Sequence, residues 1–381
     1  MIFKISSLLE NRIHIVSFNI PYPPDYGGVI DVYYKIKALY EKNVEIILHC
    51  FEYGREQTDE LNKLCYKVHY YNRPKSFFYA LKSLPFIVAT RNSKDLKNNL
   101  LEDNYPIIFE GLHSTYFIPE LILNNRNIIV RTHNIEHNYY RGLAKAETNI
   151  LKKIFYNIES KKLKSYESIL RLVKHIAAIS PKDKEYFSYK YGHTVLIPAF
   201  HSHDDVEIKS GKGEYVLFQG DLSVSDNVKS VLFLINEVFN SLNVPFIIAG
   251  KNPNKRIFSA INSNQNIKLI ANPDEFQMNE LLANAHVNIL TTFHSSGVKL
   301  KLLSALYRGR HCLVNNLMAE NTGLEGLCHF ASDASEFKSQ LKNLFNISFD
   351  IDEIDHRKGI LNNLFNINRN AEKLIEIIFQ K

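Results

Sequence analysis

Cysteines and long apolar runs are both scarce in this sequence. Only 4 of the 381 residues are cysteines, and they lack the CxxC or Cys/His spacing of a metal site: Cys50, Cys65, Cys312 and Cys328. We therefore expect reduced core thiols in a cytoplasmic protein. No run approaches the ~18 uninterrupted apolar residues of a spanning helix, and the N-terminus MIFKISSLLENR does not resemble a signal peptide. We predict that any contact with a membrane is peripheral, on the inner face of the cytoplasmic membrane.

Charge of one sign is only slightly in excess. The 46 basic residues exceed the 40 acidic ones by a formal +6, which is too little to indicate nucleic-acid binding but compatible with anionic substrates or a lipid surface. A composition of 45% hydrophobic and 23% charged residues is typical of globular proteins. A chain of 381 residues is longer than a usual domain with a single hydrophobic core, so we expect two α/β domains.

Short apolar runs alternate with longer amphipathic stretches, which predicts parallel sheets. The polar segment after residue 198 divides this pattern into an N-terminal domain, 1–198, and a C-terminal domain, 199–381, whose final helix can pack back on the first. Ligands of such folds bind at the carboxyl ends of the strands, so we expect the two domains to face each other across a cleft. The expected strands are Arg12–Phe18, Val44–Cys50, Lys67–Tyr71, Ile107–Phe109, Ile128–Thr132, His175–Ile179, Val195–Pro198, Tyr215–Gln219, Phe246–Ala249, Ile267–Ile270, Val287–Leu290, His311–Val314 and His329–Phe330.

A glycine pair follows the first expected strand. Gly27 and Gly28 allow the backbone to approach a ligand closely, and the helix after them offers free N–H groups to an anion. The motif is not GxGxxG, which disfavours a dinucleotide-binding oxidoreductase. A plain strand-to-helix turn is the alternative interpretation.

Polar residues crowd the end of the strand Ile128–Thr132. They are Arg131, His133, Asn134, Glu136 and His137. The spacing of the two histidines is not that of HExxH and no third ligand is evident, so we predict no metal site here. The cluster is either a substrate-facing site or a buried hydrogen-bonded network.

The second domain repeats a layout of strand, glycine and polar loop. Gly220 ends the first strand of this domain, and the next strand is followed by Gly250 and Lys251. This layout is typical of a Rossmann-like unit that holds a phosphate or a base.

The segment after strand Val287–Leu290 carries the sharpest signal. Ser296 and Gly297 precede an expected helix, Lys299–Tyr307, that contains Lys299 and Lys301. A diphosphate could accept hydrogen bonds from the first N–H groups of the helix, with an ammonium group beside it. Residues two apart do not share a helix face, so we expect Lys301 rather than Lys299 to reach the ligand. The alternative interpretation is that these lysines are solvated side chains on the helix surface and bind no ligand.

The expected long helix 150–174 is strongly basic. It carries seven basic residues against two acidic ones, Glu159 and Glu167. Such a helix can rest on anionic lipid, and an ordinary solvated face is the other interpretation.

Together, FQGDLSVSDN, FIIAGKNP and SSGVKLKLLSALYRGRHCLVNN resemble the nucleotide-binding half of GT-B glycosyltransferases of the retaining "glycosyl transferases group 1" type. EGLHSTYF and RTHNIEHNYY resemble segments of bacterial members associated with surface-polysaccharide (capsule) synthesis. The resemblance covers nearly the whole chain, strongly for 215–330 and more loosely before residue 105.

This resemblance implies a hexosyltransferase that moves a sugar from a nucleotide diphosphate donor to a saccharide acceptor, which a lipid carrier would hold, with retention of configuration. No metal or other cofactor is implied, and no nucleic-acid partner. The donor would be held by Gly27, Gly28, Gly220, Lys251, Ser296, Gly297, Lys299 and Lys301. His133 would face the transferred sugar, and Asp25 would contact the acceptor.

Two glutamates common in the broad family are replaced here by Ser296 and Ser304. The second commonly holds the donor ribose, so ribose recognition would need another group. Two alternatives therefore remain: an inactive GT-B scaffold subunit, and a GT-B sugar-nucleotide epimerase or hydrolase.

Overall fold

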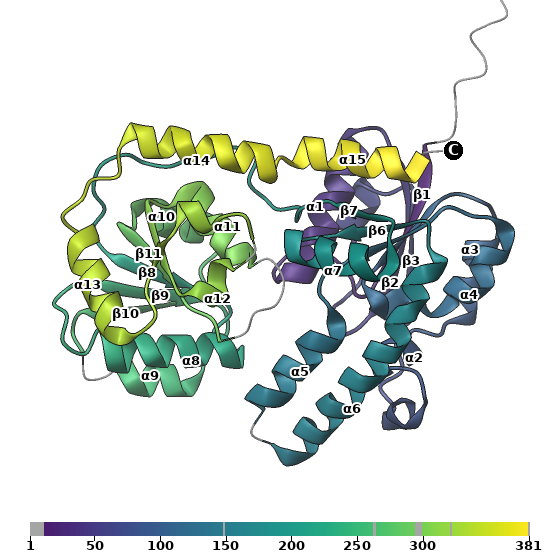
Figure 1. Ribbon diagram of the computed structural model, residues 1–381, viewed down its shortest axis with the longest axis horizontal. Helices are drawn as coiled ribbons and strands as arrows, with labels where there is room; N and C mark the ends of the chain where they lie inside the picture. The colour runs from purple at the N-terminus through teal and green to yellow at the C-terminus, as the bar shows by residue number, and fades with distance from the viewer. Residues whose placement is uncertain (1–10, 148, 262–263, 294–298, 321, 380–381) are drawn as a thin grey trace, which may run out of the picture. The chain divides into compact units, whose positions relative to one another are not determined.

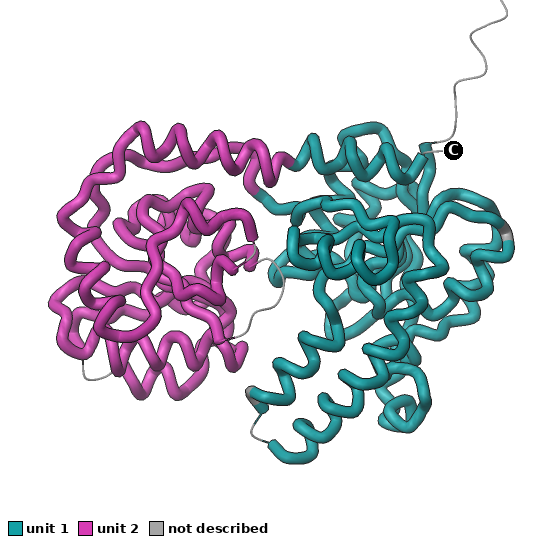
Figure 2. Tube along the Cα trace, in the orientation of Figure 1, with its two compact units in different colours: residues 1–202, 296–298, 367–381 teal, residues 203–295, 299–366 magenta. Residues whose placement is uncertain are grey.

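The computed structural model describes residues 11–379 apart from positions 148, 262–263, 294–298 and 321. It consists of two compact units, each built on its own parallel sheet (Figure 2). The described part of unit 1 lies within residues 1–202 and 367–381, and that of unit 2 within 203–295 and 299–366. The predicted fold class, two Rossmann-like parallel-sheet domains, is confirmed.

Unit 1 contains a seven-stranded sheet in the order β3-β2-β1-β4-β5-β6-β7. The strands β1, β2, β4, β5 and β6 consist mostly of buried residues, as expected for a sheet covered on both faces, whereas the edge strands β3 and β7 are mostly half-buried. Their bounds are β1 Arg12–Ser17, β2 Glu45–Glu52, β3 Lys67–Asn72, β4 Ile107–Glu110, β5 Ile128–Thr132, β6 His175–Ala178 and β7 Thr194–Leu196.

Helices cover both faces of this sheet (Figure 1). On one face, α1 (Gly27–Glu41) and the C-terminal helix α15 (Ile367–Phe379) share a core with alternate strand residues. On the other face, α3 (Lys94–Leu101), α4 (Ile118–Leu121) and α7 (Pro181–Tyr191) cover the remaining strand residues. The other elements of unit 1 are η1 Asp59–Lys63, η2 Phe77–Leu81, α2 Phe86–Ala89, η3 Leu112–Phe117, η4 Ile122–Asn124, α5 Glu136–Ala146, α6 Ile150–Tyr166 and η5 Glu167–Leu172.

The helix expected over 150–174 is shorter than predicted. The α-helix α6 ends at Tyr166, and a 3₁₀ segment continues from Glu167. The buried Glu167 carboxylate interacts with four side chains of other elements, which anchor the chain at this position: His137, Tyr186, Lys190 and Tyr191. Such long-range contacts do not show in a helical pattern.

Unit 2 contains a six-stranded sheet in the order β10-β9-β8-β11-β12-β13. The helix expected over 227–242 is α8 followed by a π-helical segment, η6, and both pack on the same face of the sheet. The strands are β8 Val216–Gln219, β9 Phe246–Gly250, β10 Ile267–Ala271, β11 Val287–Leu290, β12 His311–Val314 and β13 His329–Phe330. The helices are α8 Ser225–Phe233, η6 Leu234–Val238, α9 Lys255–Ile261, α10 Glu275–Asn284, α11 Leu300–Arg308, α12 Asn316–Ala319, η7 Glu325–Leu327, α13 Ala334–Leu344 and α14 Ile351–Leu364. Among the described helices, none combines the length and apolar character needed to cross a membrane.

Candidate functional site

Each sheet has a point at which the order of its strands reverses. In unit 1 this point lies between β1 and β4, and in unit 2 between β8 and β11. Loops leaving neighbouring strands in opposite directions open a crevice there, beyond the carboxyl ends of the strands, and ligands of doubly wound folds bind in it. The side chains that follow these strands are therefore the candidates for ligand contact.

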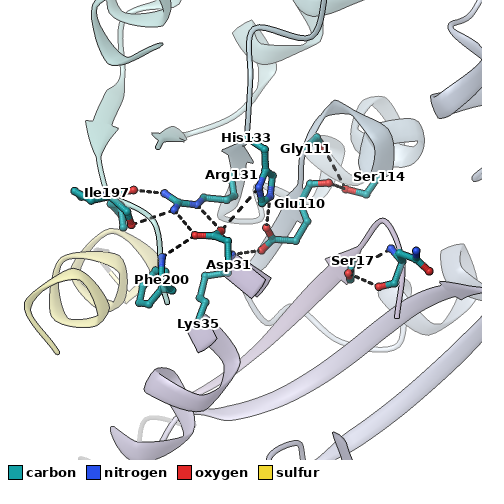
Figure 3. Close-up of polar contacts among 12 residues, drawn as sticks. Ser17, Asp31, Lys35, Glu110, Gly111, Ser114, Arg131, His133, Ile197 and Phe200 are labelled. Carbon is teal, nitrogen blue, oxygen red and sulfur yellow. Dashed lines mark hydrogen bonds and ion pairs between the residues drawn. The ribbon is translucent and has the colours of Figure 1, made fainter. Parts of the chain in front are cut away.

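A network of five titratable side chains lies at the carboxyl edge of the unit 1 sheet (Figure 3). Asp31 receives two hydrogen bonds from the Arg131 guanidinium, at 3.1 and 2.8 Å, and lies 3.2 Å from Lys35 Nζ. Lys35 Nζ also lies 2.7 Å from Glu110 Oε1, and Glu110 Oε2 lies 3.0 Å from His133 Nε2. All but His133 are fully buried, so each charge is compensated by a neighbour rather than by water.

The acidic members of this network are held in their charged form. Burial alone would raise the pKa of Asp31, but Arg131 and Lys35 keep that pKa well below its usual range. Burial likewise opposes ionisation of Glu110, and Lys35 together with the His133 hydrogen bond lowers its pKa. The backbone N–H of Phe200 donates to Asp31 and completes the coordination of that carboxylate.

His133 belongs to this network through both ring nitrogens. Nε2 contacts Glu110, and Nδ1 lies 4.0 Å from Asp31 Oδ2 (Figure 3). The side chain is about one-tenth exposed, at the end of β5. The sequence allows two interpretations of the polar cluster, a substrate-facing site and a buried hydrogen-bonded network. In this structure His133, Arg131 and their neighbours form a hydrogen-bonded network.

Asp31, Glu110 and His133 offer ligand atoms close enough together to hold a metal ion, within 4.8 Å of one another. However, the Lys35 ammonium bridges the two carboxylates, and the Arg131 guanidinium binds Asp31. These residues therefore form an ion-pair network, and a metal ion would have to displace a cation already present.

Of the glycine pair, Gly28 packs close to His133 through Phe18. A Cβ atom on Gly28 would lie 2.7 Å from the Phe18 ring, whereas one on Gly27 would meet no atom within 4 Å. The Phe18 ring in turn meets the His133 ring edge-on, with 5.5 Å between centroids. Gly28 therefore lets the start of α1 approach the residues that follow β5. Asp25, in the same loop, is ion-paired with Arg55 at 2.7 Å.

The other members of the polar cluster have different surroundings. His137 Nδ1 lies 3.1 Å from Glu167, so the two histidines contact different carboxylates. Glu136 is buried, and its Oε1 atom has no hydrogen-bond partner in the described structure. Burial raises the pKa of Glu136 to about 8, so this side chain is a neutral carboxylic acid at pH 7.

In unit 2, Lys301 lies at the strand-order reversal. Its Nζ donates to Asn227 Oδ1 at 2.9 Å and lies 3.5 Å from the Thr291 carbonyl oxygen, so both acceptors are uncharged. Burial lowers the pKa of Lys301 to about 8; Asp226 opposes this shift and Lys299 contributes to it. Asp226 itself accepts from Thr292 Oγ1 and the Phe293 N–H, at 2.7 and 2.9 Å.

Lys299 differs from the expectation in one respect. It is the N-cap residue of α11 rather than part of the helix, because the helix begins at Leu300. Helical spacing therefore does not separate Lys299 from Lys301, and burial also lowers the pKa of Lys299. Two ammonium groups thus face one carboxylate, Asp226, at the N-terminus of α11.

The glycines of unit 2 bring two loops together. A Cβ on Gly250 would lie 1.7 Å from the Gly220 carbonyl oxygen, and one on Gly220 would lie 3.0 Å from Asn227 Nδ2. Gly220 thus leaves room for the amide that accepts from Lys301. Lys251 is exposed in the second of these loops. Ser296 and Gly297 lie outside the described residues.

Ser304 lies one turn after Lys301 on the same side of α11. His203 Nε2 lies 3.1 Å from the Ser304 hydroxyl, and the His203 ring stacks on Tyr307. The His203 imidazole therefore lies beside Ser304. In the family that this sequence resembles, a glutamate that binds the ribose commonly occupies the corresponding position.

Several site residues were not predicted from the sequence: Asp31, Lys35, Glu110, Phe18, Asp226 and Asn227. A signal for the first two exists, since an acid and a base four residues apart interrupt the apolar face of α1. Their partners come from β4 and β5, 75 to 100 residues further along the chain, and no local pattern gives that pairing.

Comparisons with known proteins connect this geometry to a fold family. No family model matches the sequence. The chain is 26% identical over 336 residues to a Klebsiella pneumoniae protein described as an uncharacterized 44.6 kDa protein in the cps region, covering 82% of this chain and 84% of that protein.

Solved structures of the same architecture cover almost the whole chain. Sucrose-phosphate synthase from Thermosynechococcus elongatus superposes with a TM-score of 0.69 at 14% identity, covering 95% of this chain and 97% of that one. A glycosyltransferase from Rickettsia africae gives 0.63 at 15% identity, with coverages of 96% and 97%. A variant of S. aureus TarM, in complex with fondaparinux, α-GlcNAc-glycerol and UDP, gives 0.64 at 10% identity, with coverages of 97% and 100%. The chain therefore has the GT-B fold of these glycosyltransferases.

Proposed function

We propose, from the GT-B fold that this chain shares with glycosyltransferases, that it transfers a sugar from a nucleotide diphosphate donor to a saccharide acceptor. The observation that carries the proposal is Lys301. Its ammonium is half-buried at a helix N-terminus and at the strand-order reversal of unit 2, and its hydrogen-bond acceptors among the described residues are uncharged.

This arrangement suits a diphosphate leaving group. The nucleotide diphosphate gains negative charge as the sugar departs, and fixed positive groups stabilise that charge in the transition state. Lys299, Lys301 and the N-terminus of α11 supply positive charge opposed by one nearby carboxylate, Asp226. The burial that depresses the lysine pKa values would be offset when an anion binds, because a phosphate favours the ammonium form.

The remaining groups of the proposed donor site surround Lys301. Gly220 lies next to Asn227, which accepts from Lys301, and the Lys251 loop lies next to Gly220 and Leu222. We assign the ribose hydroxyls to the Ser304–His203 pair, since both its groups can donate and accept hydrogen bonds. Ser296 and Gly297 remain proposed donor ligands on the strength of the sequence resemblance.

His133 is the proposed sugar-facing residue of unit 1. Its ring is held by Glu110, so contact with a leaving oxygen would require one nitrogen to exchange a carboxylate for the substrate. Asp25 is proposed for acceptor contact, held by Arg55. We also propose retention of configuration, a hexose as the sugar and a lipid-linked acceptor, which rest on the sequence resemblance alone. A role in capsule or surface-polysaccharide synthesis is proposed from the same resemblance and is supported by the cps-region relative. We propose that no metal or other cofactor takes part.

The test is calorimetric titration with a panel of nucleotide diphosphates and nucleotide sugars, without divalent ions. Lys301→Met keeps the aliphatic stem but removes the ammonium, and should weaken binding of the preferred nucleotide about 10- to 100-fold, the worth of one charged hydrogen bond. Lys268→Met, an exposed lysine on β10 of the same unit, should bind as the wild type does.

Turnover is then measured by mass spectrometry of products formed from mixed donors and a membrane extract. His133→Ala should retain donor affinity within about twofold and lose most product formation. Binding that depends on manganese, or a Lys301→Met variant with unchanged affinity, contradicts the proposed donor site. A chain that binds no nucleotide is a scaffold, and release of free sugar without an acceptor identifies a hydrolase.

A further inference from the structure

Two neighbouring segments of unit 1 present large apolar side chains to solvent. They belong to η2 and α6, and their exposure ranges from 48% for Ile158 to 79% for Phe78. We call this set the apolar tip: Phe77, Phe78, Leu81, Ile150, Leu151, Ile154 and Ile158. Scattered apolar residues on a surface are ordinary, but several on one side of a helix form a stripe that indicates a binding surface.

The two segments are attached to each other. Lys162 Nζ on α6 donates to the Ala80 carbonyl oxygen of η2 at 2.6 Å. The Phe86 N–H of α2, the next helix after η2, donates to Glu159 on α6 at 2.5 Å. The antiparallel helices α5 and α6 extend together from the sheet of unit 1 (Figure 1). Ser160 joins them by a 2.7 Å hydrogen bond to the His137 carbonyl oxygen, so the tip rests on a fixed hairpin.

The apolar residues of α6 lie on the side that does not pack on the protein. At about 100° per residue, Ile150, Leu151, Ile154 and Ile158 fall within about 100° of one another around the helix. The buried positions Glu159, Ser160 and Leu163 fall on the opposite side. The helix therefore has an internal face that holds it in the fold and an external apolar stripe with no partner in the described structure.

Basic side chains border this stripe. In residues 75–82 and 150–166, which the structure describes completely, the one acidic residue is Glu159, and it is buried and paired with Lys162 at 3.0 Å. Exposed lysines occur throughout both segments: Lys75, Lys82, Lys152, Lys153, Lys161 and Lys164. An apolar stripe flanked by lysines matches the acyl chains and anionic headgroups of a bilayer. A second copy of the chain would place like charges opposite one another.

We infer that the apolar tip inserts into the headgroup region of an anionic membrane, with the flanking lysines on lipid phosphates. This surface is independent of the proposed donor site and its test requires no activity. The probe is co-sedimentation of the full chain with vesicles of phosphatidylcholine alone, or of phosphatidylcholine containing phosphatidylglycerol. Binding should require phosphatidylglycerol and should fall as salt is raised.

Two sets of variants separate the contributions. Ile150→Ser, Leu151→Ser and Ile154→Ser together should lower the partition coefficient about tenfold or more, and so should Lys153→Gln, Lys161→Gln and Lys164→Gln together. The matched control, Leu123→Ser with Tyr189→Ser, removes two other exposed apolar side chains of unit 1 and should partition as the wild type does.

Three results would overturn the inference. The first is a wild-type chain that does not bind vesicles containing phosphatidylglycerol, and the second is a set of tip variants that partition as well as the wild type. The third is self-association, measured by sedimentation velocity, that the serine variants abolish. The last result would make the tip an interface between copies of the chain. Circular dichroism of each variant verifies that it is folded.

Discussion

Individual side chains at the carboxyl edge of the unit 1 sheet carry properties that packing alone would not require. Glu136 is the clearest case, because its carboxyl group is buried at the start of α5 with one oxygen unpartnered in the described structure. A buried polar group without a partner costs stability, so this carboxyl group makes the stability of the fold depend on pH.

The pH dependence of stability tests this property of Glu136. Its pKa is raised to about 8 from 4.5, so between these pH values the unfolded chain releases a proton that the folded chain keeps. Glu136 therefore destabilises the fold increasingly as pH rises, by at most about 1.4 kcal/mol per pH unit. Glu136→Gln should be more stable than the wild type in urea unfolding at pH 7.5, with little difference at pH 5.

Glu185→Gln, which changes an exposed glutamate on α7, provides the control and should change stability equally at both pH values. If Glu136→Gln instead lost stability at pH 7.5 relative to pH 5, the carboxyl group would be ionised in the folded chain and its environment would differ from the one described.

Between elements, the ion-pair network joins α1 to the ends of β4 and β5. Lys35 touches both carboxylates, so removing its charge leaves two buried anions with fewer compensating groups. Breaking a buried pair from one side costs about 3–5 kcal/mol. Lys35→Met should therefore lower the free energy of unfolding of unit 1 by about that amount. The measurement is the unit 1 transition in urea denaturation of the full chain.

Two further variants define this prediction. Lys63→Met removes an exposed lysine paired with Glu60 and should cost less than about 1 kcal/mol. Adding Glu110→Gln to Lys35→Met should restore part of the loss, because the uncompensated charge disappears. A purely additive double variant would show that the two residues act independently.

For the whole molecule, the C-terminal helix completes the core of unit 1 although it follows unit 2 in the chain (Figure 2). Four of its side chains belong to the core on the α1 face of the sheet: Ala371, Leu374, Ile377 and Ile378. Asn127 also donates to the carbonyl oxygens of Ile377 and Ile378. Stability of the first unit thus depends on the last residues of the sequence.

Deleting residues 367–381 should destabilise unit 1 and leave unit 2 nearly unchanged. Burial of Leu374, Ile377 and Ile378 contributes roughly 1.5–3 kcal/mol each, so the loss is about 5–9 kcal/mol. Calorimetry should show that the thermal unfolding transition of unit 1 moves to a lower temperature, while the unfolding temperature of unit 2 does not change.

Leu374→Ala should produce the same change on a smaller scale, whereas Leu317→Ala, at an exposed leucine of unit 2, should leave both transitions unchanged. Equal shifts of both transitions after the deletion would mean that α15 does not act through the core of unit 1.

The sequence by itself determined the two parallel sheets and the position of every strand named in the structure. Buried parallel strands give largely apolar runs, and β5, β11 and β12 have the predicted bounds because that signal is local. It also led to the proposal of Gly28 and Lys301 as donor ligands, and the structure places Gly28 against the Phe18 ring and Lys301 beside Asn227.

Only the tertiary structure decided which side chains meet. Lys35 and Glu110 lie 75 residues apart in sequence, and the carboxylate that ends the long helix, Glu167, is bound by residues of α5 and α7. The external apolar stripe of α6 depends on which side of the helix packs on the rest of unit 1, and the sequence alone does not give that side. Ion pairs, burial and exposure all depend on which segments pack together, and that choice is made by the whole chain.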